Sequence, residues 1–260
     1  MGQYRCMAQS TNPRSSARWL PRTGLGWLCV VLAMAGAVLL GLYAVAGFFD
    51  RDPVHLFGAG TRGKPVAAVF FSGDMGLRFG MGPYISDGLV KAGIPVLGVS
   101  SSTAFASRRT RAETDAIVAN AIRQTLRQTG ASRIVVLGQS FGADIVRVGL
   151  ADLPQDLRGR VAAAVLVVPG ATAYFRADPS GLSYRGTPDA DGSEASRLDW
   201  LPLTCIQGVT ETDTLCPALT MTNARRIALP GGHFLRNDHR LLVQTILREL
   251  GPVLKFQERF

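Results

Sequence analysis

The residues most able to perform chemistry begin with a serine placed between two glycines. Gly138-Gln139-Ser140-Phe141-Gly142 has the form G-x-S-x-G, and it lies between a run that predicts a strand and a segment that predicts a helix. In that context the motif forms a sharp turn that lifts the serine hydroxyl above the end of a sheet. The pattern alone is weak in a glycine-rich chain, so its value comes from its placement. Ser140 is therefore the expected nucleophile.

A serine hydroxyl becomes a useful nucleophile only when a base takes its proton, and a carboxylate must orient that base. In chains with this turn the order is serine, acid, histidine. The sequence has three histidines. His55 precedes the expected domain, and His239 begins the last predicted helix as an expected surface residue. His233 follows the last predicted strand in a glycine-rich loop, so it is the expected base.

Two acidic residues compete to orient the histidine. Asp213 and Glu211 both follow a predicted strand at 203–207. We favour Asp213, because an Asp followed by two or three small or apolar residues and a proline is the usual form of this loop in chains with such a serine turn. The expected triad is Ser140, Asp213 and His233.

An anionic intermediate would need two backbone amides. One is expected from Phe141, the residue after the nucleophile, and the other from the loop that follows the first long strand. That loop reads Ser72-Gly73-Asp74-Met75-Gly76, so either Asp74 or Met75 is the expected donor. A carboxylate beside a developing oxyanion is unfavourable, so the Asp74 side chain is expected to point away or to bind a cationic group. The simpler interpretation is a glycine-rich turn.

Apolar runs alternate with amphipathic segments through the rest of the chain. This pattern predicts a mostly parallel sheet with helices on both faces, the α/β class. The expected strands are 66–71, 94–99, 133–137, 161–168, 203–207 and 225–229, and the expected helices are 82–92, 110–129, 141–150 and 238–250. Residues 170–200 are rich in Gly, Pro, Asp and Ser, and they are equally consistent with an insertion over the site and with a surface loop.

The N-terminal part predicts a membrane segment. Residues 1–23 contain four arginines and no acid, and residues 24–49 carry no charge. About 20 apolar residues span a bilayer, and the basic flank stays in the cytoplasm. We therefore expect a cytoplasmic tail at 1–23, a single-pass inner-membrane anchor at 24–49, a linker at 50–64 and a periplasmic domain at 65–260. The small residues of Ala44-Val45-Ala46 also fit a cleaved signal peptide.

Composition limits the partners and the redox state. The formal net charge of +9 suits anionic phospholipid head groups. Nucleic-acid binding is not expected, since no basic stripe or reading motif is visible. No metal-ligand cluster or nucleotide loop is visible either, so no metal or cofactor is expected. An oxidising compartment permits a disulfide between Cys205 and Cys216, and two buried thiols are the alternative.

Four segments together resemble the bacterial virulence protein family VirJ/AcvB, over a stretch from about residue 66 to the C-terminus. They are SGDMG at 72–76, GQSFGADI at 138–145, the stretch from Cys205 that ends in DTLCP at 213–217, and LPGGHF at 229–234. Gln139 replaces a common aromatic and Met75 replaces a glycine. One histidine stands in the last segment where the family often has two, which leaves His233 unambiguous.

The resemblance implies an α/β-hydrolase fold and a periplasmic enzyme that removes the amino acid from aminoacylated phosphatidylglycerol, especially lysyl-phosphatidylglycerol. By position in the family motif, Asp74 and Asp144 would bind the lysyl ammonium groups. The family's link to type IV secretion and virulence implies secretion-system or other periplasmic protein partners. Two other functions stay open, namely an esterase or thioesterase for a soluble acyl substrate and a non-catalytic binding or scaffold protein.

Overall fold

A central sheet organises the chain in this computed structural model, which describes residues 24–61 and 63–255. The expected cytoplasmic tail, 1–23, lies outside the described residues. The chain divides into two compact units, one ending at Gly41 and the other beginning at Leu42. The second unit contains the whole sheet.

The sheet has seven strands in the order β1-β3-β2-β4-β5-β6-β7, and only β1 runs antiparallel to its neighbour. Continuous apolar runs, typical of parallel strands covered on both faces, form the fully buried β2 and β5. The strands are β1 Val54–Phe57, β2 Val66–Phe71, β3 Val96–Val99, β4 Arg133–Gln139, β5 Val161–Val167, β6 Leu203–Gly208 and β7 Ala224–Leu229.

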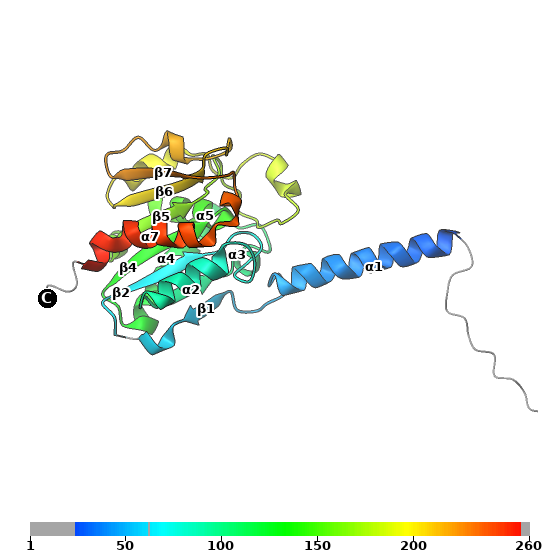
Figure 1. The fold of residues 1–260 in the computed structure, drawn as a ribbon, viewed down its shortest axis with the longest axis horizontal. Helices are drawn as coiled ribbons and strands as arrows, with labels where there is room; N and C mark the ends of the chain where they lie inside the picture. The colour runs from blue at the N-terminus through cyan, green and yellow to red at the C-terminus, as the bar shows by residue number, and fades with distance from the viewer. Residues whose placement is uncertain (1–23, 62, 256–260) are drawn as a thin grey trace, which may run out of the picture. The chain divides into compact units, whose positions relative to one another are not determined.

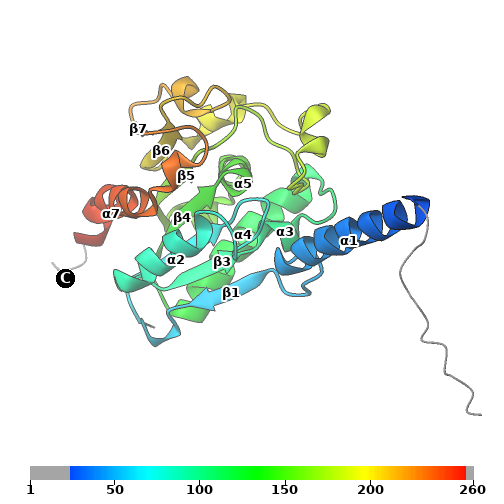
Figure 2. The same ribbon diagram turned by 45° about the vertical axis from the view of Figure 1, so that its right-hand side comes forward.

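Helices cover both faces of this sheet, as the sequence predicted. α2 and α7 lie on one face, and α4 and α5 lie on the other (Figures 1 and 2). Side chains of β2 alternate between two cores: Phe71 packs with the α4 and α5 side, and Phe70 packs with the α2 and α7 side. The helices are α1 Gly24–Val45, α2 Gly82–Lys91, α3 Ser101–Ala104, α4 Arg111–Thr129, α5 Phe141–Ala151, α6 Gln155–Arg158 and α7 His239–Lys255.

Short 3₁₀ helices interrupt the connecting segments. Two of them, η2 and η3, lie in the 170–200 segment, and η5 follows the expected base. The yellow-green part of the chain in Figure 1 contains η2, which stands away from the sheet. The five are η1 Ala59–Thr61, η2 Leu182–Arg185, η3 Ser193–Leu198, η4 Cys216–Ala218 and η5 Leu235–Asn237.

Local sequence sets the bounds of α4. The Thr110 hydroxyl accepts a hydrogen bond from the Glu113 amide, and the Glu113 carboxylate accepts one from the Thr110 amide. This reciprocal pair is a capping box. Gly130 ends the helix with a φ of 72°, a left-handed conformation that glycine adopts without strain.

The expected linker, 50–64, is wrong in part, because it contains β1. Val54 to Phe57 pair with β3 in antiparallel register and form the edge of the sheet. Four residues at an edge with one exposed side chain, His55, give too short a pattern to recognise. His55 therefore belongs to the domain, although it lies outside the candidate site.

The apolar segment forms α1, which ends at Val45 rather than at residue 49. Over its 22 residues, the best window has a mean hydropathy of 2.5, with none of that window buried. A helix of this length and composition can cross a membrane, and a signal sequence meets the same criteria.

Candidate active site

The turn around Ser140 has the backbone that its sequence predicted. Ser140 lies between β4 and α5 with φ 53° and ψ −125°, a region that non-glycine residues rarely occupy. A Cβ at Gly138 would lie 2.3 Å from the carbonyl oxygen of Gly142, and a Cβ at Gly142 would lie 2.3 Å from that of Phe71. Both glycines are therefore required for the strand, the turn and the helix to pack this closely.

A hydrogen-bonded line of three side chains starts at this serine. Ser140 Oγ lies 2.8 Å from His233 Nε2, and His233 Nδ1 lies 2.6 Å from Glu211 Oε1. With the ring proton on Nδ1, His233 donates to Glu211, and Nε2 is left to accept the serine proton. The arrangement is that of a nucleophile, a base and an orienting acid.

The acid in this line is Glu211, so the expectation for Asp213 is wrong. Glu211 follows β6 in a tight turn in which its amide donates to the Gly208 oxygen at 3.1 Å. The second oxygen of its carboxylate accepts from the Gly208 amide at 3.2 Å, and the side chain is buried. Asp213 lies further along the loop, is exposed, and accepts a hydrogen bond from the Ala171 amide at 3.1 Å.

The loop that follows β6 and contains Glu211, the acid loop, packs closely against the loop that follows β7 and contains His233, the histidine loop. Glycines allow this close approach. A Cβ at Gly208 would lie 2.3 Å from the Gly232 oxygen, and the Thr210 amide donates to the Gly231 oxygen at 3.0 Å. After the histidine, η5 has positive φ at its three residues, Leu235, Arg236 and Asn237. Such left-handed non-glycine residues cluster at functional sites.

The expected disulfide is present. Cys205 in β6 bonds to Cys216 in η4, with their Cα atoms 5.5 Å apart. The bond closes the loop that contains Glu211, so it restricts the paths open to the carboxylate. In the chain-entropy description a loop of this size stabilises the fold by about 3 kcal/mol.

The loop after β2 lies beside the serine turn because β2 and β4 are parallel neighbours, with Phe71 opposite Gly138. Within the part of the chain that the structure describes, the Phe141 and Met75 amides donate no hydrogen bond. The Asp74 amide interacts with the carboxylate of its own side chain. Phe141 and Met75 are therefore better placed than Asp74 to stabilise an oxyanion.

The three groups open into a cavity of about 610 Å³. Four carboxylates line it, and no lysine or arginine among the described residues does: Asp74, Asp144, Glu211 and Asp213. Its aromatic lining consists of Phe79, Phe141, Tyr174, Tyr184 and Phe234. The cavity is thus acidic and aromatic in a chain whose net charge is +9.

Comparison with known proteins identifies the chain. Residues 65–253 match the family model of the bacterial virulence protein VirJ. The chain belongs to the VirJ family. A comparison with curated protein sequences finds no match.

Solved structures similar to this VirJ-family chain share its α/β-hydrolase fold. A thioesterase domain from the curacin biosynthetic pathway has a TM-score of 0.55 at 14% identity, covering 75% of this chain and 94% of its own. A putative α/β-hydrolase from Agrobacterium tumefaciens has 0.55 at 14%, covering 78% and 92%. An esterase from Pyrococcus furiosus has 0.52 at 13%, covering 73% and 84%.

Asp74 and Asp144 of the VirJ-family chain have different surroundings in the cavity wall. The Tyr184 hydroxyl donates to Asp74 Oδ2 at 3.1 Å, and burial raises the pKa of Asp74. Asp144 accepts from the Gly170 amide at 2.9 Å, and burial raises its pKa well above the ordinary value. Asp144 is thus already engaged at the end of β5.

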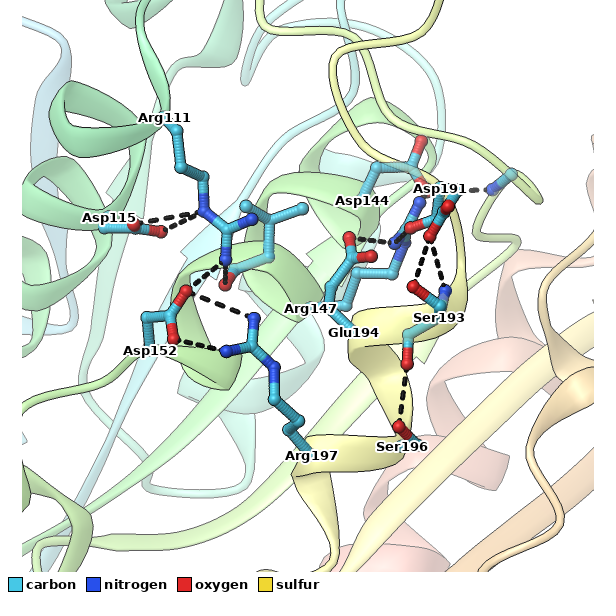
Figure 3. Close-up of polar contacts among 12 residues, drawn as sticks. Arg111, Asp115, Asp144, Arg147, Asp152, Asp191, Ser193, Glu194, Ser196 and Arg197 are labelled. Carbon is cyan, nitrogen blue, oxygen red and sulfur yellow. Dashed lines mark hydrogen bonds and ion pairs between the residues drawn. The ribbon is translucent and has the colours of Figure 1, made fainter.

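The 170–200 segment is fastened to α5 (Figure 3). The buried Arg147 places Nη1 2.6 Å from the Glu194 carboxylate and donates to the Asp191 oxygen at 2.7 Å. On the surface, Arg197 lies 2.6 Å from Asp152. Tyr184 in the same segment reaches the cavity, a contribution that periodicity could not predict.

Within residues 24–61 and 63–255, no group of three or more His, Cys, Asp or Glu side chains is placed to hold a metal ion. His239, expected at the surface, stacks on Tyr84 with ring centroids 3.8 Å apart. Residues of the expected set that meet at the cavity are Ser140, His233, Phe141, Asp74, Met75, Asp144 and Asp213.

Proposed function

We propose that this VirJ-family protein is a serine ester hydrolase that removes the amino acid from aminoacylated phosphatidylglycerol, with lysyl-phosphatidylglycerol as the main substrate. The observation that supports this best is the line Ser140, His233 and Glu211 opening into an acidic cavity. The names of similar structures, esterases and a thioesterase, agree with the reaction class.

The geometry suits an acyl-enzyme route. His233 Nε2 takes the Ser140 proton while Oγ attacks the ester carbonyl carbon. The Phe141 and Met75 amides would stabilise the resulting oxyanion, since amides at a helix N-terminus and in the adjoining loop favour negative charge. As the carbon–oxygen bond to the lipid glycerol breaks, His233 returns the proton to the departing oxygen. Water then enters with His233 as base and releases the amino acid.

Charge explains the preference for a lysyl group. A lysyl ester carries two ammonium groups, and carboxylates without competing cations would attract them. Asp74 is the most available, because its partner is the neutral hydroxyl of Tyr184. The exposed Asp213 also lines the cavity and would take the second ammonium group. Asp144 is less available, because Arg147 Nε lies 3.8 Å from its carboxylate.

The decisive experiment measures lysine release from lysyl-phosphatidylglycerol vesicles by the purified full-length chain. Ser140→Ala should lower turnover by about four to six orders of magnitude, because the acyl-enzyme cannot form. Ser132→Ala, an exposed serine before β4, should behave as the native chain does. Lysine release by Ser140→Ala at the native rate would contradict the proposal.

A soluble thioester or ester is the second candidate, favoured by the similarity to a thioesterase domain. The same preparation should then turn over a short aryl or thioester substrate faster than the lysyl lipid. A third candidate, a scaffold with no activity, requires that a fluorophosphonate probe fail to label Ser140. Labelling that disappears in Ser140→Ala would exclude it.

A further inference from the structure

Four segments at the cavity each expose one large apolar side chain. Met75 lies in the loop after β2, Leu182 belongs to η2, Val209 follows β6, and Phe234 follows His233. Their exposed fractions are 42% for Met75, 64% for Leu182, 61% for Val209 and 66% for Phe234. We call these four residues the rim.

Single exposed apolar residues are ordinary on a protein surface. The rim differs because its members come from four separate segments and all lie in, or within two residues of, the lining of one cavity. Met75 and Phe234 line the cavity themselves, and Leu182 and Val209 lie within two residues of the lining residues Tyr184 and Thr210. Apolar groups gathered around a site in this way indicate an interaction surface.

The end of the apolar helix is attached beside the rim, within the unit that begins at Leu42. Arg78 donates to the Val45 oxygen at 3.0 Å, and the Ser102 hydroxyl donates to the Ala46 oxygen. A Cβ at Gly76 would lie 2.4 Å from the same Ala46 oxygen. Gly76 follows Met75 and lines the cavity. The point where α1 ends therefore adjoins the loop that forms part of the opening.

Positive charge accompanies the apolar rim. Three exposed arginines on the same segments have no ion-pair partner among the residues that the structure describes: Arg176, Arg185 and Arg236. Apolar side chains that enter the acyl boundary, with arginines at head-group level, are the usual components of an interfacial membrane site. A protein partner would not require an apolar helix attached at the same place.

We propose that the rim and these three arginines dock onto the anionic bilayer that holds α1, so that the cavity opens against the lipid head groups. This inference rests on the proposed function for its substrate, because a lipid ester must reach Ser140 from the bilayer. The docking itself requires no turnover.

Quenching of tryptophan fluorescence by lipids brominated in their acyl chains tests the docking. Two variants of the full-length chain carry the tryptophan probes, Leu182→Trp and Val209→Trp. Each variant is reconstituted into phosphatidylcholine–phosphatidylglycerol vesicles that contain the brominated lipid. Lys91→Trp is the control, since Lys91 ends α2 before β3 begins and its side chain is 75% exposed. After subtraction of the native signal, the two rim probes should be quenched several-fold more than the control. Equal quenching at all three positions would overturn the docking.

A second measurement separates this inference from the proposed function. Ser140→Ala combined with either rim probe should give the same quenching. In the active chain, Leu182→Ser with Val209→Ser should slow lysine release from vesicles by roughly a hundredfold, about tenfold for each apolar side chain lost from the bilayer contact. Labelling by a soluble fluorophosphonate should be unchanged. Quenching without lysine release would contradict the substrate and leave the docking supported. Lysine release without quenching would support the substrate and contradict the docking.

Discussion

Two carboxylates that are two residues apart in the acid loop have different partners. Glu211 contacts His233 and the Gly208 amide, and Asp213 contacts the Ala171 amide. The turn that returns the Glu211 amide to Gly208 brings the longer side chain under the imidazole. Only the residue that contacts the ring can hold its tautomer and stabilise the imidazolium.

Replacing each of these acids in turn should show which one orients the base. Glu211→Gln should lower kcat on a soluble aryl ester by about three to four orders of magnitude, because an amide stabilises the wrong tautomer. Asp213→Asn, the matched control, should lower it by roughly tenfold or less. Equal losses, or a larger loss in Asp213→Asn, would restore Asp213 as the acid.

The raised pKa of Asp74 predicts how the preference for a lysyl ester depends on pH. Burial raises the pKa of Asp74 above its usual range, while the Tyr184 hydroxyl opposes that rise. Its negative charge is therefore present above the raised pKa and lost as the pH falls through it. The ratio of kcat/KM for a lysyl ester to that for a neutral ester should fall on acidification, and Asp74→Asn should flatten the change.

Tyr184→Phe serves as the companion variant. It removes a hydrogen bond that favours the carboxylate, so the pKa of Asp74 should rise and the fall in the ratio should begin at a higher pH. The pH dependence for the neutral ester should stay near that of the native chain, because a substrate without an ammonium group gains nothing from the Asp74 charge. If the pH midpoint of the fall in this ratio is the same in Tyr184→Phe and in the native chain, Asp74 does not recognise the charge of the substrate.

The sequence predicted the contact between Ser140 and His233 but not the contact between His233 and Glu211, and the reason is physical. The serine turn is fixed by local backbone geometry, since the positive φ of Ser140 and the absent side chains at Gly138 and Gly142 leave little freedom. The acid depends on how a loop folds between β6 and the disulfide. That path depends on contacts with the histidine loop, which are distant in sequence.

At the scale of elements, the buried Arg147 joins the 170–200 segment to α5. Arg147→Met should lower the free energy of unfolding by about 3 to 5 kcal/mol, because the buried Glu194 is left without its counter-charge. Arg147→Met with Glu194→Leu should recover most of that loss. The half-exposed Arg197 is the control, and Arg197→Met should cost about 1 kcal/mol or less.

Denaturant unfolding monitored by circular dichroism would measure these differences. A small loss in Arg147→Met would mean that Glu194 reaches solvent and that the 170–200 segment is only weakly attached. Residue types alone could not predict this attachment, because Arg147 lies in a helix whose neighbouring residues form an ordinary apolar pattern. Its partner Glu194 lies 47 residues away.

Continuous apolar runs predicted the central strands well. β2 and β5 are buried along their whole length and β4 is buried after Arg133, so nearly every position had to be apolar or small. β1 was missed because an edge strand of four residues needs no such run. The order of the strands was also beyond prediction, since β3 and β4 lie on opposite sides of β2 for reasons of long-range pairing.

At the scale of the whole molecule, strand order explains where the cavity lies. The chain leaves β2 for β3 on one side and then crosses to β4 on the other, and ligands of such sheets bind where the order reverses. The loop with Met75 and the turn with Ser140 both start at that point. Acidic residues collect there while the chain as a whole carries +9, so the cavity favours a cationic ligand although the net charge of the chain does not.

The attachment of α1 bears on whether the N-terminal segment is an anchor or a cleaved signal. Cleavage after Ala46 would remove residues that the folded unit contacts, since Ala46 is 5% exposed and its oxygen accepts a hydrogen bond from the Ser102 hydroxyl. Arg78 donates a hydrogen bond to the Val45 oxygen, and the Thr103 hydroxyl donates one to the Gly47 oxygen at 2.7 Å. We therefore expect an uncleaved anchor. Intact mass spectrometry of the membrane-extracted protein should show a chain near 27.8 kDa, whereas a chain that begins at Gly47 would contradict this expectation.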